Sequence, residues 1–220
     1  MYKLSRQDWK VLLNDLGSTF GSSIIPQSVQ INWFEKLCGQ YDQTWRRYHN
    51  AIHIIHLLNQ FELRGKAVAK NPLAVLTAIW FHDAEMEPGL QTNEFWSAVM
   101  ASEFCEQAGL SDVFMDTVIT LILATTPNGV EHETPDERLI ADINRSVLGG
   151  TSMQFCDMEN QIQQEYVGSG FVTNEEHNRR HTVFLRKMLL WQRIYQTEIF
   201  YKEYEHQARE NIRRFLNTFT

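Results

Sequence analysis

Residues 71–83 of the chain read NPLAVLTAIWFHD, a run of apolar side chains that ends in a histidine and an aspartate. Pro72 is typical of the first turn of a helix, and the residues from Leu73 to Phe81 would cover that helix with apolar groups on every side. A helix of this kind is buried in a core. Asp83 is therefore expected away from bulk water, where a carboxylate needs a partner or a metal.

The rest of the chain repeats apolar residues at helical spacing and has few alternating β-branched runs. Its 5 prolines stand mostly where helices would begin. The pattern therefore predicts an all-α fold. Candidate N-caps are Ser5, Thr92 or Asn93, Ser111 and Thr134. The expected helices cover 5–16, 26–37, 50–63, 72–81, 92–109, 111–125, 134–150, 151–167, 173–195 and 203–217. The expected loops include 17–23, 85–91 and 126–133.

Length and charge limit the domain count and the partners. A chain of 220 residues, 43 % of them hydrophobic, can bury one sizeable core, so we expect a single domain over 1–220. The formal net charge of -7 argues against a nucleic-acid polymer as the partner, because such binders carry a basic surface that neutralises phosphates. A small anionic substrate in a local pocket is compatible with this charge.

The cysteines and the hydropathy pattern predict the cellular compartment of the protein. Cys38, Cys105 and Cys156 are widely spaced and form no CxxC pair, so we expect buried thiols in a reducing compartment. Charges continue through Asp8 and Lys10, which leaves no signal-peptide core, and no apolar run approaches membrane-spanning length. These patterns predict a cytoplasmic protein with no membrane partner.

Three histidines lie at helical spacing before the apolar segment. His49, His53 and His56 share one face of the helix expected at 50–63, opposite an apolar face. If that helix is buried, its imidazoles point toward the interior, where they can bind a metal ion. The alternative is a stripe of solvated or hydrogen-bonded histidines with no ligand role.

Two aspartates can complete a metal site. Instead of binding a metal, Asp83 could form a salt bridge with Arg46 or Arg47, or cap the turn that follows. Asp142 borders the apolar stripe of the helix expected at 134–150, so its carboxylate should lie along the edge of the core. Taken alone, it would most often pair with Arg138 or Arg145 on the helix surface.

Together, His53, His82, Asp83 and Asp142 come from three expected helices and form a mixed nitrogen and oxygen set. Such a set suits Mn, Fe, Co, Ni or Zn and leaves coordination positions for water and substrate. Only one further histidine, His132, lies between Asp83 and Asp142, so few ligands are available for a second metal ion. The sequence therefore predicts about one divalent ion per chain.

The order His53, His82-Asp83 and Asp142 resembles the H…HD…D signature of the HD superfamily of metal-dependent phosphohydrolases. Further stretches are similar to a subfamily of predicted bacterial HD phosphohydrolases, and they extend the resemblance over nearly the whole chain. These stretches are Arg47–Asn50 with His53-Ile54, Trp80–Ala84, Asn93-Glu94 with Ser97-Ala98, Ser146–Gly149, Glu165-Tyr166, Arg193–Tyr195 and Ala208–Asn211.

This resemblance implies a compact multi-helix HD-domain bundle with a C-terminal helical extension. It also implies one bound divalent ion, which could be Mg as well as Mn, Fe, Co, Ni or Zn. It makes His53, His82, Asp83 and Asp142 the metal ligands, and Asp83 the partner of the attacking water. His49 competes with His53 for the first ligand position. His53 is preferred because it lies one turn inside the helix, at the family spacing.

Two positions depart from the family pattern. Asn144 stands where an aspartate is expected two residues after Asp142, and Met86 stands where an aromatic residue would follow the HD pair. Neither change removes a predicted ligand.

The candidates on the substrate side are His49, Arg47, Glu94 and His132. Arg47 could meet a phosphate or be an ordinary surface arginine. Glu94 could contact substrate or the metal ligands, or it could simply favour the N-terminus of its helix. The subfamily tends to carry a Thr…His pair before the last aspartate, and here His132 with Thr125 or Thr126 could form it.

The implied reaction is hydrolysis of a phosphate ester, with a nucleotide or another small phosphorylated metabolite as the substrate. A first alternative is an HD protein that keeps its metal for structure or ligand sensing without turnover, and Asn144 motivates it. A second is a di-metal HD oxygenase or phosphodiesterase, which would need further histidines. A third is a metal-free helical interaction protein, which requires all four ligand candidates to be coincidental.

Overall fold

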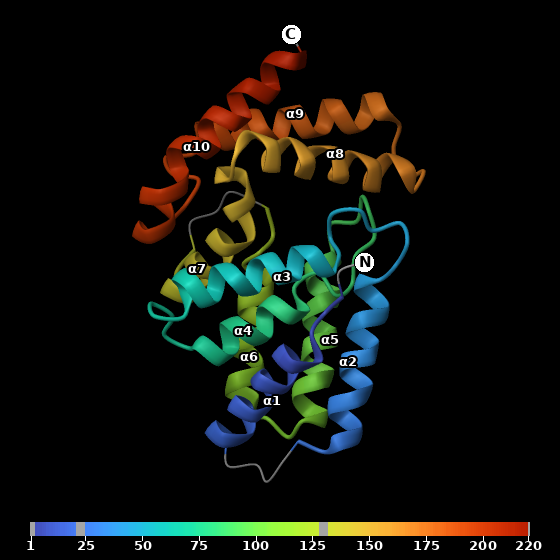
Figure 1. Cartoon of the computed structure of the whole chain (residues 1–220), viewed down its shortest axis with the longest axis vertical. Helices are drawn as coiled ribbons and strands as arrows, with labels where there is room; N and C mark the ends of the chain where they lie inside the picture. The colour runs from blue at the N-terminus through green and yellow to red at the C-terminus, as the bar shows by residue number, and fades with distance from the viewer. Residues whose placement is uncertain (1–2, 21–24, 128–131, 220) are drawn as a thin grey trace.

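The computed structural model describes residues 3–20, 25–127 and 132–219. Within these ranges the chain consists of helices and loops with no β-strand, so the all-α prediction is confirmed (Figure 1). A π-helical turn, Phe61–Gly65, continues α3, and a 3₁₀ turn, Ser146–Gly149, continues α7. The α-helices are α1 (Arg6–Phe20), α2 (Gln27–Tyr41), α3 (Ala51–Gln60), α4 (Pro72–Phe81), α5 (Asn93–Gln107), α6 (Asp112–Leu123), α7 (Pro135–Arg145), α8 (Ser152–Gly168), α9 (Asn174–Leu190) and α10 (Glu198–Leu216).

Helix α4 is the central element of the first part of the chain. It packs against α1, α3, α5, α6 and α7, and every residue from Thr77 to Phe81 is buried. Trp80 meets Trp9 of α1 edge to face, with ring centroids 5.3 Å apart. The predicted burial of this helix is confirmed. Because α4 ends inside the bundle, the two polar residues that follow it are carried into the interior.

Helices α8, α9 and α10 form a layer over one end of this bundle (Figure 1). α10 packs against α8, α9 and the 3₁₀ turn Ser146–Gly149. Gly149 is required there, because a Cβ at this position would lie 2.5 Å from Cβ and 2.9 Å from Cα of Tyr204. Asn211 of α10 donates to the carbonyl oxygens on both sides of Gly149, each at 2.9 Å. The last long helix is therefore bound to the end of α7.

Several helices begin at the predicted caps. The hydroxyls of Ser5, Ser111 and Thr134 each accept a backbone N–H from the first turn of the following helix, at 3.2 to 3.3 Å. Thr92 is the N-cap of α5, but its side chain makes no capping bond.

Helix α1 is longer than predicted. It continues through residues 17–20, where the sequence suggests a loop, and 21–24 lie outside the described residues. The extra turn is supported by Phe20, whose ring lies 5.0 Å from that of Phe114 in α6.

The ends of α9 and α10 also differ from the prediction. Helix α9 ends at Leu190 rather than near 195, and α10 begins at Glu198 rather than near 203. Arg209 of α10 donates to the carbonyls of Leu189 and Trp191, at 2.9 and 2.8 Å, and thereby satisfies backbone acceptors at the end of α9. This capping is a tertiary contact, which local sequence does not reveal.

Among the described residues, no helix has both the length and the hydropathy needed to cross a membrane. Cys105 is buried and Cys38 is partly buried, but Cys156 lies exposed on α8. The prediction of buried thiols is therefore wrong for Cys156, because this residue lies on the solvent-facing side of its helix.

Candidate functional site

Three of the four predicted metal ligands lie together at the end of α4. His82 and Asp83 directly follow α4, and His53 lies in the first turn of α3. The Nε2 atoms of His53 and His82 are 3.2 Å apart, and Asp83 Oδ2 lies 2.9 Å from His82 Nε2 and 3.4 Å from His53 Nε2. Two nitrogens and one oxygen thus converge, and this donor set can hold a divalent metal ion.

A hydrogen bond selects the tautomer of His82. Its Nδ1 lies 3.0 Å from the carbonyl oxygen of Ile79 and must donate, because a carbonyl only accepts. In a neutral imidazole Nε2 is then an acceptor, and it faces His53 Nε2 and the carboxylate of Asp83. Acceptors this close repel one another unless a proton or a metal cation lies between them, so these residues fit a cation.

Burial and charge set the protonation of the other two ligands. Burial lowers the pKa of His53 to about 4, and its Nδ1 is buried with no hydrogen-bond partner in the described part of the chain. Burial alone would raise the pKa of Asp83, but the imidazoles of His82, His49 and His53 outweigh it and hold that pKa well below its usual range. A neutral imidazole and an ionised carboxylate are the forms that a metal ion binds.

Asp142 does not join this group, which corrects the predicted ligand set. Its Oδ1 accepts the N–H of Gln196 at 2.9 Å, and its Oδ2 accepts the N–H and the hydroxyl of Thr197 at 2.7 and 2.6 Å. Thr197 is the N-cap of α10, so Asp142 stabilises the start of that helix. Burial raises the pKa of Asp142 to about 6, against the effect of these hydrogen bonds.

Asn144 lies where the sequence pattern departs from the family, and it lines a cavity together with Asp83 and His49. Two residues turn an α-helix by about 200°, so Asn144 is on the other side of α7 from Asp142. Its side chain makes no hydrogen bond to another residue that the structure describes. An amide therefore lines the cavity at the position where the family pattern expects a carboxylate.

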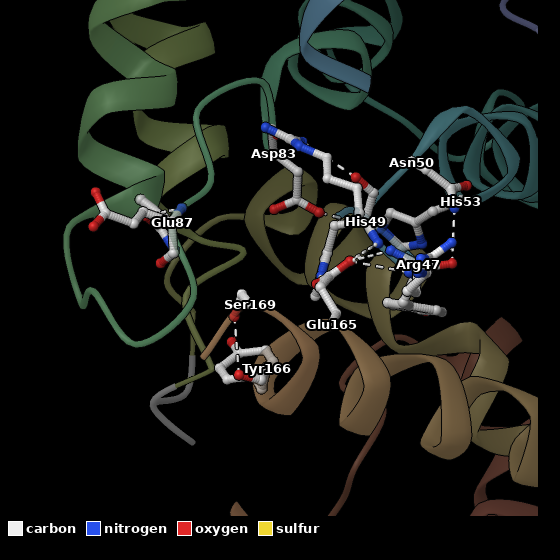
Figure 2. A network of polar contacts seen from close by, with 12 residues as sticks. Arg47, His49, Asn50, His53, Asp83, Glu87, Glu165, Tyr166 and Ser169 are labelled. Carbon is white, nitrogen blue, oxygen red and sulfur yellow. Dashed lines mark hydrogen bonds and ion pairs between the residues drawn. The ribbon is translucent and has the colours of Figure 1, made fainter. Parts of the chain in front are cut away.

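Glu165 of α8 holds the segment that precedes α3 (Figure 2). Its Oε2 accepts the backbone N–H groups of Arg47, Tyr48 and His49, at 2.9, 3.0 and 3.1 Å. Its Oε1 binds Nδ1 of His49. Glu165 is fully buried, so these four donors replace the water that a carboxylate otherwise needs.

Arg46 holds the same segment to the end of α4. Its Nη1 donates to the carbonyls of Asp83 and His49, at 2.6 and 3.2 Å, and its Nη2 donates to the carbonyl of Ala84 at 2.9 Å. The guanidinium thus binds backbone oxygens instead of forming the predicted alternative of a salt bridge with the Asp83 carboxylate. It anchors the two ligand-bearing segments to each other.

His49 lies between Glu165 and Asp83 (Figure 2). Because a carboxylate accepts, Nδ1 of His49 carries a hydrogen toward Glu165, and Nε2 is left for the cavity. Burial opposes the charged imidazole, but the carboxylates of Glu165 and Asp83 outweigh it and raise the pKa of His49. The charged form of this residue is therefore favoured over that of a free imidazole, and it can offer a positive charge, or a proton, to a bound molecule.

The cavity beside the cluster has a volume of about 370 Å³, in the range of small-molecule sites. Its polar lining includes Glu94 and Arg145, in addition to Asp83, His49 and Asn144. Burial, with help from the charge of Asp83, raises the pKa of Glu94. Arg145 donates from Nη1 to the carbonyl of Ile194 at 2.9 Å. The structure therefore places the predicted residues His49 and Glu94 on one cavity with Asp83.

The other two predicted substrate residues do not line this cavity. Arg47 is exposed, and its side chain lines a separate hollow with Gln163 and Asn174. His132 is buried, with Nε2 unpaired among the described residues, and its backbone N–H donates to Gln196 at 3.0 Å. The structure thus brings neither side chain to this cavity, because one faces solvent and the other packs elsewhere. The neighbouring residues 128–131 lie outside the described ranges.

Sequence reasoning does not find the roles of Glu165 and Arg145. The only signal for Glu165 is that the pair Glu165-Tyr166 lies within the family resemblance, and the residue it binds, His49, is 116 positions away. The sequence offers Arg145 only as a possible surface partner of Asp142, and gives no sign that it lines the cavity. Both residues act through contacts between distant parts of the chain.

Comparisons of the chain with protein-family models, with curated proteins and with solved structures found no match. The resemblance to the HD superfamily therefore stays a prediction.

Proposed function

We propose that this protein is a metal-dependent phosphohydrolase of the HD type that acts on a small phosphate ester. The observation that carries the proposal is the convergence of His53 Nε2, His82 Nε2 and Asp83 Oδ2 within 3.4 Å of one another. Asp83 also lines a cavity of about 370 Å³ that can admit a small substrate. A ligand group beside a cavity of this size favours catalysis or ligand binding over a purely structural role.

His53, His82 and Asp83 would hold one divalent cation, and the amide of Asn144 is available on the lining of the same cavity. When bound, such a cation supplies Lewis acidity, which activates water and offsets negative charge on a phosphoryl oxygen. The mixed nitrogen and oxygen donors suit Mn, Fe, Co, Ni or Zn.

The two oxygens of Asp83 have different surroundings. Oδ2 faces the two imidazoles, whereas Oδ1 makes no hydrogen bond to a described residue. Since its pKa is held low, Asp83 is ionised at neutral pH, and Oδ1 can accept a hydrogen bond from an attacking water and orient it.

His49 and Arg145 bring positive charge to the same cavity. Because its pKa is raised, His49 keeps a proton that it can give to the leaving oxygen, and Glu165 orients the ring for this transfer. The guanidinium of Arg145 donates one hydrogen bond to Ile194 and keeps further N–H donors for a phosphate.

The test is a phosphate-release assay on the full chain, first stripped of metal and then supplied separately with Mn²⁺, Co²⁺, Ni²⁺, Zn²⁺ or Mg²⁺. The substrates are phosphomonoesters, nucleotides and cyclic nucleotides. We expect metal-dependent turnover of at least one ester, reduced by about 100-fold or more in Asp83→Asn. Asp116→Asn, on the exposed side of α6, is the matched control and should keep full activity. Absence of metal-dependent phosphate release from every ester would overturn the proposal.

A second candidate function is an HD-type protein that binds metal and senses a ligand without turnover. Asn144 favours it, because a neutral amide on the cavity lining offsets less cationic charge than a carboxylate does. Stoichiometric metal binding without turnover of any ester in the panel would support this second function.

A further inference from the structure

The cavity has a second wall, formed by side chains of α8 and α9 and by Trp191 directly after α9. We call it the α8–α9 wall. None of its residues has a role in the phosphohydrolase proposal above. Its apolar members are Ile162, Phe184, Leu185, Met188 and Trp191, and its polar members include Glu159, His177 and His181.

Glu159 is a buried carboxylate in this largely apolar wall. It is 3 % exposed, and its Oε2 lies 2.5 Å from Nε2 of His181. Its Oε1 is buried and has no hydrogen-bond partner in the part of the chain that the structure describes. An unpaired buried acceptor is unfavourable, so a donor from a bound molecule would be stabilised at this point.

Aromatic rings cluster around His181, which binds this carboxylate. His177 stacks on His181, with ring centroids 5.4 Å apart and planes 15° from parallel, and Tyr166 lies 5.7 Å from His177. The ring of Phe184 lies 6.3 Å from His181. Aromatic rings of a protein favour stacked or edge-on contact with another flat ring.

We propose that the α8–α9 wall binds the organic group of the substrate, and that this group is an aromatic ring with an N–H or O–H donor directed at Glu159 Oε1. The inference rests on the proposed function, because the phosphate of the same molecule would lie at the Asp83 end of the cavity. His181 holds the carboxylate through Oε2 and leaves Oε1 as the acceptor. A ring that carries only acceptors is rejected, because it leaves this buried oxygen unpaired.

The test uses molecules that lack the phosphate, so that binding is measured apart from turnover. Adenosine, guanosine, cytidine, uridine and pyridoxine are titrated by calorimetry into the metal-free full chain. We expect at least one of these probes to bind at a single site. Glu159→Gln should weaken that binding by about tenfold or more, because it replaces the charged acceptor with an amide. Glu175→Gln, at an exposed position of α9, is the matched control and should bind as the wild type does.

Two further measurements keep the inference testable if Glu159→Gln does not fold. Phe184→Ala should weaken binding of the same probe, and a methylated analogue of the probe that lacks the donor should bind wild type at least about tenfold more weakly. No binding of any probe, or equal binding by Glu159→Gln and Glu175→Gln, would overturn the inference.

The two proposals fail separately. Metal-dependent hydrolysis of aliphatic phosphate esters by a chain that binds none of the probes would contradict the inference and leave the phosphohydrolase intact. Probe binding that depends on Glu159, in a chain that hydrolyses no ester, would support the inference and contradict the proposed function.

Discussion

His82 shows how one backbone contact prepares a side chain for metal binding. The carbonyl of Ile79 takes the hydrogen of Nδ1 at 3.0 Å, so Nε2 is left as an acceptor toward His53 and Asp83. His49 also donates its Nδ1 hydrogen, but its partner is the carboxylate of Glu165, whose negative charge favours the charged ring. Two imidazoles of one site are thereby given different chemistry by their partners.

Two substitutions test whether Asp142 is a metal ligand: one replaces the amide of Asn144 with a carboxylate, and the other replaces the carboxylate of Asp142 with an amide. Asn144→Asp should tighten binding of a divalent ion by about tenfold or more, because it adds a charged oxygen to the cavity lining. Asp142→Asn should leave metal affinity unchanged and lower the free energy of unfolding by about 1–3 kcal/mol, because its amide would turn N–H groups toward the donors of Gln196 and Thr197. Calorimetric metal titration and urea unfolding measure the two effects. A folded Asp142→Asn protein that has lost its metal would restore Asp142 as a ligand.

Among the elements, the helices that bury apolar faces are those that the sequence predicts best. The all-round apolar pattern of α4 predicts both its helix and its burial, and it carries His82 and Asp83 into the interior as expected. The errors occur where a distant side chain decides a helix end. Asp142 binds the start of α10 and Arg209 binds the end of α9, and neither contact leaves a local pattern.

The same limit applies to the candidate site. His53, His82 and Asp83 could be predicted because their spacing places imidazoles and a carboxylate on helices that share a core. Asp142 could not be placed, because residues 142 and 144 lie on different sides of α7 and only the packing of that helix decides which one faces the cavity. Glu165 could not be predicted from spacing, because it reaches the segment before α3 from α8.

The contact between the 3₁₀ turn and α10 makes a prediction about two glycines. Gly149→Ala should destabilise the protein by about 1–3 kcal/mol, because the new Cβ would meet the backbone of Tyr204. Gly39→Ala, in α2, has nothing within 4 Å of its new Cβ and should stabilise by about 0.5–1 kcal/mol. Guanidinium unfolding of both variants gives the comparison. Equal stabilities would mean that α10 does not pack on the turn as described.

For the whole molecule, lowering the pH should lower the free energy of unfolding, because the folded protein buries the neutral histidine His177. Burial, with a smaller effect from His181, lowers the pKa of His177 to about 4, whereas an unfolded histidine has a pKa of about 6.5. Between these two pKa values the unfolded chain binds the extra proton, so stability falls as the pH is lowered. The slope from one such group is at most about 1.4 kcal/mol per pH unit.

His177→Phe keeps an aromatic ring beside Tyr166 and His181 but removes the titration. Relative to this variant, the wild type should lose stability from about pH 6.5 down to about pH 4 and show no pH-dependent difference above pH 7. Urea unfolding in a chelator, at a series of pH values, measures the difference without any contribution from metal. Parallel pH profiles for the two proteins would show that His177 titrates normally in the folded chain.

Metal titration of His53→Ala and His49→Ala tests the proposed centre most directly. The wild type should bind about one divalent ion per chain, since the group supplies ligands for a single site. His53→Ala should lose the ion, because its Nε2 lies 3.2 Å from that of His82, whereas His49→Ala should keep the ion, because its Nδ1 is held by Glu165. Circular dichroism of both variants shows that they fold. A folded His49→Ala protein without metal, beside a His53→Ala protein that binds it normally, would contradict the assignment.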